Sequence, residues 1–242
     1  MDKLYIVIPA YNEADNLEML MNDWYPIIEN SQNKESRLVV VNDGSKDDTY
    51  DILCRMAEQR AMLKVLNKQN GGHGSAVLFG YRYAIENGAD YIFQTDSDGQ
   101  TRPEEFQAFW DLREQYDAII GNRPTRGDGF SRWMVEKVLC SVLFFIFGVR
   151  ISDSNAPFRL MKRVLLEKYI DKLPADFFLP NVMFTTYFKY YGENMKFVDI
   201  TFESRKGGSN SINIPKICKI GLNAVKDFRM LRRDIVKNGR LK

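Results

Sequence analysis

Short apolar segments alternate with amphipathic segments through the first half of the chain, and this alternation constrains the fold more than any other feature. The amphipathic segments predict helices over 12–28, 47–59, 75–87 and 103–115. The apolar segments predict buried strands over 4–8, 37–41, 63–66, 91–93 and 117–120. Strands that alternate with helices in this way form a mostly parallel sheet with helices on both faces. The sequence therefore predicts an α/β, Rossmann-like fold.

The second half of the chain has a different pattern. It predicts a very apolar helix over 130–149, a long loop over 150–158, further helices, one strand over 196–202 and a terminal helix. No repeat or Pro/Ser-rich linker divides the 242 residues. We therefore expect a single domain over 1–242, in which 1–125 is the sheet-forming half and 126–242 is a mainly helical C-terminal elaboration.

Charge is unevenly distributed along the chain. The segment 205–242 contains 11 Lys and Arg against two acids, a net charge of +9, whereas the remainder carries −7. A basic segment of this kind indicates an anionic partner, namely phosphate, phospholipid or nucleic acid, and the alternative is a solvated helical face. A nucleic-acid partner is disfavoured because the segment lacks interleaved aromatic residues and any nucleic-acid-reading motif.

Three cysteines and the first residues of the chain indicate the compartment. Cys54, Cys140 and Cys218 are odd in number and lack metal-ligand spacing, which favours buried thiols in a reducing cytosol. The start, 1–4, has neither the apolar run nor the cleavage site of a signal peptide. No stretch of about 18 apolar residues occurs, so we expect a cytoplasmic protein with no membrane-spanning segment.

Four polar clusters, each placed after a predicted strand, are the candidate site. They are 9–13, 42–45, 70–74 and 96–100. Because ligands of parallel α/β sheets bind beyond the carboxyl ends of the strands, we expect all four clusters to gather along one edge. The cluster 70–74 could offer backbone N–H groups to phosphate, but it is not the dinucleotide-binding fingerprint, since Val77 stands where the third glycine belongs.

Two carboxylates in the last cluster suggest a metal site. Asp96 and Asp98, separated by one residue at a strand end, can both approach Mg²⁺ or Mn²⁺, whose remaining ligands are typically substrate phosphates and water. The alternative is a turn with capping aspartates. Asp43 follows another buried strand and is placed to accept hydrogen bonds from a ribose or base; the alternative is that it caps the helix that begins near Asp47.

Taken together, these clusters resemble those of the family 2 glycosyltransferases of the GT-A fold. The shared segments over 1–125 are Ile8–Glu13, Val41–Ser45 with Asp48-Thr49, and Asp96–Gln100. Within that family the chain is most similar to polyprenyl-phosphate sugar transferases of the dolichol-phosphate mannose synthase type. The features shared with that group are Asp98 with Gln100, Gly121–Arg123, Asp153 with Pro157–Arg159, and Arg205–Ser209.

The resemblance implies a role for each matching residue. Pro9, Tyr11, Glu13 and Asp43 would hold the nucleotide sugar, and Asp96, Asp98 and Gln100 would surround the metal and the diphosphate. Arg123, Arg132 and Arg205 would face the acceptor phosphate, and Ser209 would also bind substrate. Of these residues, Asp98, Arg123 and Arg205 are the expected catalytic ones. The resemblance thus divides the chain into a nucleotide-sugar and metal half, 1–125, and an acceptor and membrane half, 126–242.

The chain departs from the family pattern at three positions. His73 replaces the lysine usual in the glycine loop, which leaves a cationic role there open. Asn181 stands where many relatives place an acidic residue, so no general base is evident; an ionised phosphate acceptor needs none, whereas a hydroxyl acceptor would. Gly129 replaces the glutamine of the Gln-x-x-Arg-Trp motif before Arg132-Trp133, which disfavours a processive polysaccharide synthase.

These observations predict a metal-dependent, inverting glycosyltransferase that moves a sugar from a nucleotide donor to a polyprenyl phosphate. One alternative is transfer to a hydroxyl of a glycan or lipid-linked oligosaccharide, and another is a catalytically idle module that binds a nucleotide or a partner protein. Two segments could meet the inner face of the membrane: the apolar stretch 139–149 and the terminal helix. For each the alternative is packing within the protein. The terminal helix has one apolar stripe, formed by Ile214, Ile217, Gly221, Ala224, Phe228, Leu231 and Ile235.

Overall fold

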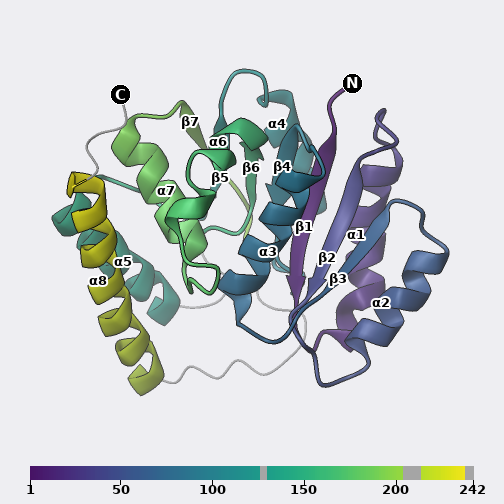
Figure 1. Cartoon of the computed structure of the whole chain (residues 1–242), viewed down its shortest axis with the longest axis horizontal. Helices are drawn as coiled ribbons and strands as arrows, with labels where there is room; N and C mark the ends of the chain where they lie inside the picture. Colours follow the sequence, from purple (N-terminus) through teal and green to yellow (C-terminus); the bar gives the residue numbers. More distant parts are fainter. Residues whose placement is uncertain (126–129, 204–213, 238–242) are drawn as a thin grey trace.

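The computed structural model describes residues 1–125, 130–203 and 214–237, with the side chains of 130–132, 214–223, 234 and 237 excepted. The described residues form a seven-stranded sheet in the order β3-β2-β1-β4-β6-β5-β7 (Figure 1). The strands are β1 (Leu4–Ala10), β2 (Arg37–Asn42), β3 (Leu63–Asn67), β4 (Tyr91–Gln94), β5 (Ala118–Asn122), β6 (Arg159–Lys162) and β7 (Met195–Asp199). Adjacent strands are parallel except at β6, which runs antiparallel to both β4 and β5.

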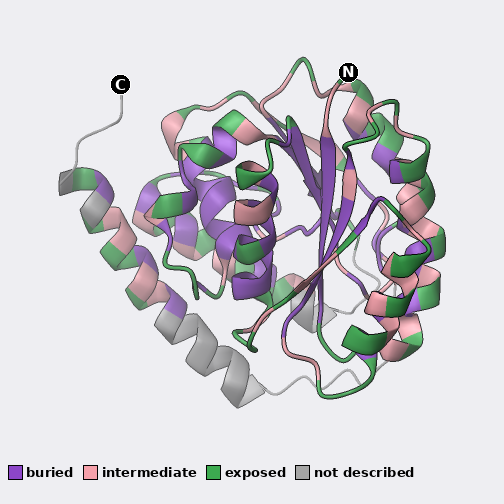
Figure 2. Ribbon diagram, turned by 45° about the vertical axis from the view of Figure 1, so that its right-hand side comes forward, coloured by how far each residue is buried: buried purple, intermediate pink, exposed green. Residues whose placement is uncertain are grey.

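Helices cover both faces of this sheet, as predicted. One face packs against α1 (Leu17–Glu29), α2 (Thr49–Glu58) and α4 (Phe106–Asp111). The other packs against α3 (His73–Glu86), α5 (Phe130–Phe147), α6 (Arg163–Glu167), α7 (Pro180–Tyr191) and α8 (Ile214–Lys237). Figure 2 shows the buried strands between these two layers. Short 3₁₀ turns complete the element list, at η1 (Ala14–Asn16), η2 (Pro103–Glu105) and η3 (Ile170–Lys172).

Alternation along each strand assigns side chains to the two cores. Ile6 and Ile8 of β1 contact the core beneath α1, whereas Val7 contacts the core beneath α3, and all three are fully buried. A strand buried on both faces reads as a continuous apolar run, which is why the central strands were predicted from the sequence.

Several boundaries differ from the prediction. The first helix begins with η1, at Ala14, and the helix predicted over 103–115 ends at Asp111. A helix was predicted to follow the loop 150–158 directly. That prediction is wrong, because the strand β6 comes first and lies between β4 and β5 in the sheet. The strand predicted over 196–202 ends at Asp199, and Phe202 makes only an isolated bridge to Thr101.

The terminal helix α8 packs against the protein through its apolar stripe. Ala224, Phe228 and Ile235 are buried, and the Phe228 ring lies 6.3 Å from the ring of Phe147 in α5. Of the two alternatives for this stripe, docking on the protein is therefore the one observed along its described part. Among the helices of the described ranges, none combines the length and the apolarity that crossing a bilayer requires.

Candidate active site

The four polar clusters meet in one cleft of about 400 Å³ at the carboxyl ends of β1, β2 and β4. It is lined by Pro9, Ala10, Tyr11, Glu13, Asp43, Asn70, Gly72, His73, Ala76, Asp96, Ser97 and Asp98. The prediction that the clusters gather along one edge is thus confirmed. Because β1, β2 and β4 are parallel, each delivers its following loop to the same side.

Asp43 organises the glycine loop at one end of the cleft. Its carboxylate accepts hydrogen bonds from the Lys68 ammonium group at 2.6 Å, the Gly71 N–H at 3.0 Å and the Gly72 N–H at 2.7 Å. Gly72 has a φ of +85° and a ψ of 165°, a conformation accessible essentially only to glycine. Asp43 does not cap α2, because Asp47 accepts the Thr49 N–H at 3.1 Å.

His73 begins α3 and faces the carboxylates at the end of β4. Its Nε2 atom lies 2.9 Å from Oδ1 of Asp96. Partial desolvation in the cleft, where the His73 side chain remains 49% exposed, disfavours the imidazolium, but the carboxylates of Asp96, Asp98 and Asp43 prevail and raise the pKa of His73. Burial likewise disfavours the Asp96 carboxylate, but His73 and the arginines behind it hold its pKa below the ordinary value. The end of the cleft nearest α3 thus pairs an ionisable imidazole with the anionic strand end.

Asp96 and Asp98 fit a hard divalent cation. Both line the cleft, although among the described residues, those of this cleft included, no group of three or more His, Cys, Asp or Glu side chains could by itself hold a metal ion. Two carboxylates leave most of the coordination shell open, which suits Mg²⁺ or Mn²⁺ completed by phosphate oxygens and water. Gln100 lies behind them, because its side chain donates to the Glu203 carbonyl at 2.8 Å and its backbone N–H to Asp98 at 3.2 Å.

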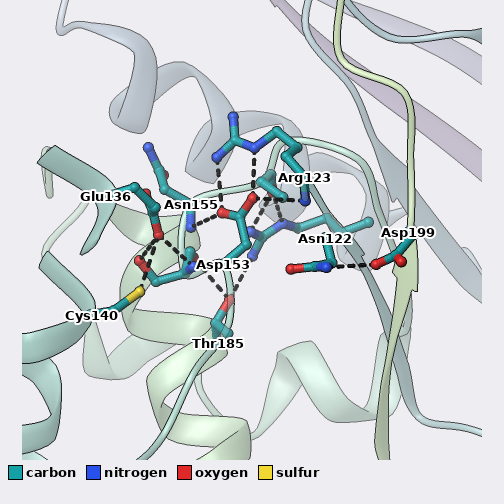
Figure 3. Close-up of polar contacts among 11 residues, drawn as sticks. Asn122, Arg123, Glu136, Cys140, Asp153, Asn155, Thr185 and Asp199 are labelled. Atoms are coloured by element: carbon teal, nitrogen blue, oxygen red, sulfur yellow. Dashed lines mark hydrogen bonds and ion pairs between the residues drawn. The ribbon is translucent and has the colours of Figure 1, made fainter. Parts of the chain in front are cut away.

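Arg123 is held by a partner that sequence analysis did not assign to it. Its Nε and Nη2 atoms donate to the two carboxylate oxygens of Asp153 at 2.6 and 2.9 Å (Figure 3). Both side chains are 4% exposed, and the guanidinium carbon lies 4.8 Å from the centre of the Phe202 ring. Such a two-point contact fixes the plane of the guanidinium group. The signal available in the sequence was that Gly121–Arg123 and Asp153 both belong to segments of the resemblance, which named them without pairing them.

A buried polar network extends from this pair into α5 and α7. Glu136 of α5 accepts hydrogen bonds from the N–H and hydroxyl groups of Ser154 at 2.7 and 2.8 Å, and Thr185 of α7 donates to the Ser154 carbonyl at 3.2 Å. Burial, with the nearby Glu136 carboxylate, raises the pKa of Cys140 to about 12. The loop 150–158 is thereby fixed between α5 and α7, as Figure 3 shows.

Asn181 lies in the first turn of α7, above Arg159. Its backbone carbonyl accepts a hydrogen bond from Nη1 of Arg159 at 3.1 Å, and Arg159 is fully buried. The side chain of Asn181 is 2% exposed, and its Oδ1 atom has no hydrogen-bond partner among the described residues. The position therefore holds a neutral amide beside a buried cation.

The remaining predicted site residues lie outside the described side chains. Arg132 is in the first turn of α5, and its side chain is not described, while Arg205 and Ser209 fall in the undescribed stretch 204–213. Their roles stay predictions, as do the ligand contacts of the residues that line the cleft.

Two relatives whose names state a function are sugar transferases. The chain is 27% identical over 221 residues to an undecaprenyl-phosphate 4-deoxy-4-formamido-L-arabinose transferase of Photorhabdus laumondii, covering 90% of this chain and 65% of that protein. It is 24% identical over 218 residues to an undecaprenyl-phosphate mannosyltransferase of Micrococcus luteus, covering 87% of this chain and 88% of that protein. The chain thus spans just under two thirds of the first relative's length.

Solved structures share the fold. Glucosyl-3-phosphoglycerate synthase from Mycobacterium tuberculosis, in complex with Mn²⁺ and UDP-glucose, superposes with a TM-score of 0.66 at 17% identity, covering 96% of this chain and 79% of that chain. This likeness supports the expected GT-A-type fold. The family model described as glycosyl transferase family 2 matches residues 5–170, which include β1 from Tyr5 onward, β2 to β6 and every residue that lines the cleft. With the sheet order, the cleft and this match in agreement, the chain belongs to glycosyl transferase family 2.

Proposed function

We propose that this protein transfers a sugar from a nucleotide-sugar donor to a polyprenyl phosphate, with a divalent metal ion and with inversion at the anomeric carbon. The names of the Photorhabdus and Micrococcus relatives support this acceptor class. The mycobacterial neighbour, crystallised with Mn²⁺ and UDP-glucose, supports the donor and the metal.

Donor binding is assigned to the cleft. Asp43 and the loop that it fixes would hold the nucleotide, together with Pro9, Tyr11 and Glu13. The start of α3 would lie near the diphosphate, because the N-terminus of a helix offers unpaired N–H groups and a positive dipole end to anions. A cation bound by Asp96 and Asp98 would offset the negative charge of the leaving diphosphate.

The observation that carries the acceptor assignment is the buried amide of Asn181. A hydroxyl acceptor must lose its proton to a general base, and many relatives place an acidic residue where such a base would act. The resemblance puts that acidic group at the position of Asn181, which here is a buried neutral amide whose backbone carbonyl accepts a hydrogen bond from Arg159. A phosphate oxygen is already ionised at neutral pH, so it can attack the anomeric carbon directly without a base. A direct displacement of this kind inverts the configuration.

Arginines would orient that phosphate. Arg123 is fixed in plane by Asp153, and Arg132 and Arg205 would approach from α5 and the stretch 204–213, with Ser209 as a further donor. The acceptor is a lipid, so we place the protein in the cytoplasm and peripherally on the inner face of the membrane.

The proposal is tested by a donor screen. Nucleotide sugars are incubated with Mn²⁺ or Mg²⁺ and a polyprenyl phosphate, and the glycosylated lipid is measured. Arg205→Lys should lower transfer at least tenfold while donor affinity changes little, because lysine keeps the charge but loses the two-point hydrogen bond. Arg55→Lys, on the exposed surface of α2, is the matched control.

Efficient transfer to a glycan hydroxyl, with no transfer to polyprenyl phosphate, would refute the acceptor assignment. Donor binding without any transfer would instead favour the idle module.

A further inference from the structure

The outer face of α5 presents apolar side chains to solvent. Met134, Val138 and Phe145 are 44%, 59% and 83% exposed. Their spacing of four and seven residues places them along one stripe of the helix. The opposite side of α5 is buried through Leu143 and Phe147. We call the stripe of Met134, Val138 and Phe145 the α5 outer face.

Basic side chains surround the α5 outer face. Among the described residues of α5 the exposed charged side chain is Lys137, whose ammonium group lies 5.7 Å from the centre of the Trp133 ring. Just after the helix, the Arg150 guanidinium lies 5.6 Å from the centre of the Phe144 ring. Basic and aromatic side chains beside an apolar stripe are typical of helices that lie at a membrane interface.

The neighbouring helix α8 adds to this charge. It packs against α5, and its exposed side carries Lys226, Arg229 and Arg233. Figure 1 shows the two helices side by side at one end of the molecule. Basic residues close to a surface of anionic lipid attract it electrostatically, so α8 adds positive charge at the same end of the molecule as α5.

We propose that the α5 outer face docks in the headgroup region of an anionic bilayer, with the basic face of α8 against the lipid phosphates. This inference rests on the proposed function and names the surface through which the enzyme meets its lipid acceptor. An 18-residue helix is about 27 Å long, and α5 lies along the interface without crossing it. A second copy of the chain is disfavoured as occupant, because it would bring the same cations together with no exposed acid on the described part of α5.

The inner side of α5 connects this surface to the acceptor end of the site. Glu136 lies on that side and binds Ser154, and the preceding residue, Asp153, holds Arg123. The helix that contacts lipid therefore also fixes the loop that fixes Arg123.

The test measures partition of the full chain onto vesicles of phosphatidylcholine with about one third phosphatidylglycerol. Val138→Glu should lower partition at least tenfold, because it places a charge in the apolar stripe and repels the anionic surface. Val164→Glu is the matched control, since Val164 is 54% exposed on α6, away from the α5 outer face. It should change partition less than twofold. Unaltered partition of Val138→Glu would overturn the proposal.

Two further measurements separate this proposal from the proposed function. Transfer to a short, water-soluble isoprenyl phosphate should be the same in Val138→Glu and the wild type, which would also show that the variant is folded. Failure of the wild type to use that acceptor would count against the proposed function. The effect of Val138→Glu on vesicle partition would still decide whether the α5 outer face binds the bilayer. If light scattering shows a lipid-free dimer that Val138→Glu converts to a monomer, the occupant is a second copy and the bilayer proposal is wrong.

Discussion

Replacing Asp43 by asparagine tests whether this carboxylate builds the nucleotide site. Three donors converge on it, from Lys68, Gly71 and Gly72, at 2.6, 3.0 and 2.7 Å. An amide keeps one acceptor oxygen but turns its other end into a donor, so at least one of the glycine N–H groups loses its acceptor. A hydrogen bond to a charged group contributes about 1.5–3 kcal/mol, which corresponds to about 10- to 150-fold in an equilibrium constant.

We expect Asp43→Asn to weaken nucleotide binding at least tenfold and to lower the free energy of unfolding by about 1.5–3 kcal/mol. Isothermal titration calorimetry with a nucleoside diphosphate chosen from a wild-type panel measures the first, and urea unfolding the second. Asp51→Asn, on the exposed side of α2, is the control. Affinity within twofold of the wild type, with an unchanged urea midpoint, would refute the role given to Asp43.

Gly72→Ala separates loop geometry from direct contact with the ligand. A Cβ atom at Gly72 would meet nothing within 4 Å, so the substitution acts only through the φ of +85°, at about 1–3 kcal/mol. If Gly72→Ala loses as much nucleotide affinity as Asp43→Asn, nucleotide binding depends on the conformation of the glycine loop. If affinity survives in Gly72→Ala but not in Asp43→Asn, Asp43 contacts the nucleotide itself.

Three further outcomes are expected. Asp98→Ala, and the wild type in excess EDTA, should lose transfer while circular dichroism stays unchanged; full activity in either case would contradict the metal assignment. Asp153→Ala should lower the free energy of unfolding by about 3–5 kcal/mol, because Arg123 would remain buried without its carboxylate; a urea midpoint near that of the wild type would show that the pair is dispensable. Gly74→Ala should lower the melting temperature, since its Cβ atom would lie 2.3 Å from the Phe177 carbonyl oxygen; an unchanged melting curve would mean that the segment shifts at no cost.

Sequence alone was sufficient to predict that the polar clusters line one cleft, because strand direction decides where they lie. The residues after 4–8, 37–41 and 91–93 had to meet once those strands were parallel, and the cleft shows that they do. The contacts around Arg123, in contrast, have no periodicity. Arg123 and Asp153 are 30 residues apart, and no spacing rule joins them.

β6 escaped prediction for a different reason. It has only four residues, and it begins with Arg159 and ends with Lys162, residues that ordinarily indicate exposed loop or helix. Arg159 is nevertheless fully buried, since its guanidinium donates to the Ala156 and Asn181 carbonyl groups. Tertiary contacts of this kind override the local preference of the strand.

The position of β6 also sets the order in which the sheet can assemble. β5 has β6 and β7 as its two neighbours, and both come later in the chain. During synthesis on the ribosome, β1 to β4 can therefore pair with one another while β5, an apolar strand, still has no partner. Since unpaired strands are prone to associate with other chains, the interval between the synthesis of β5 and of β6 is when this protein is most exposed to aggregation.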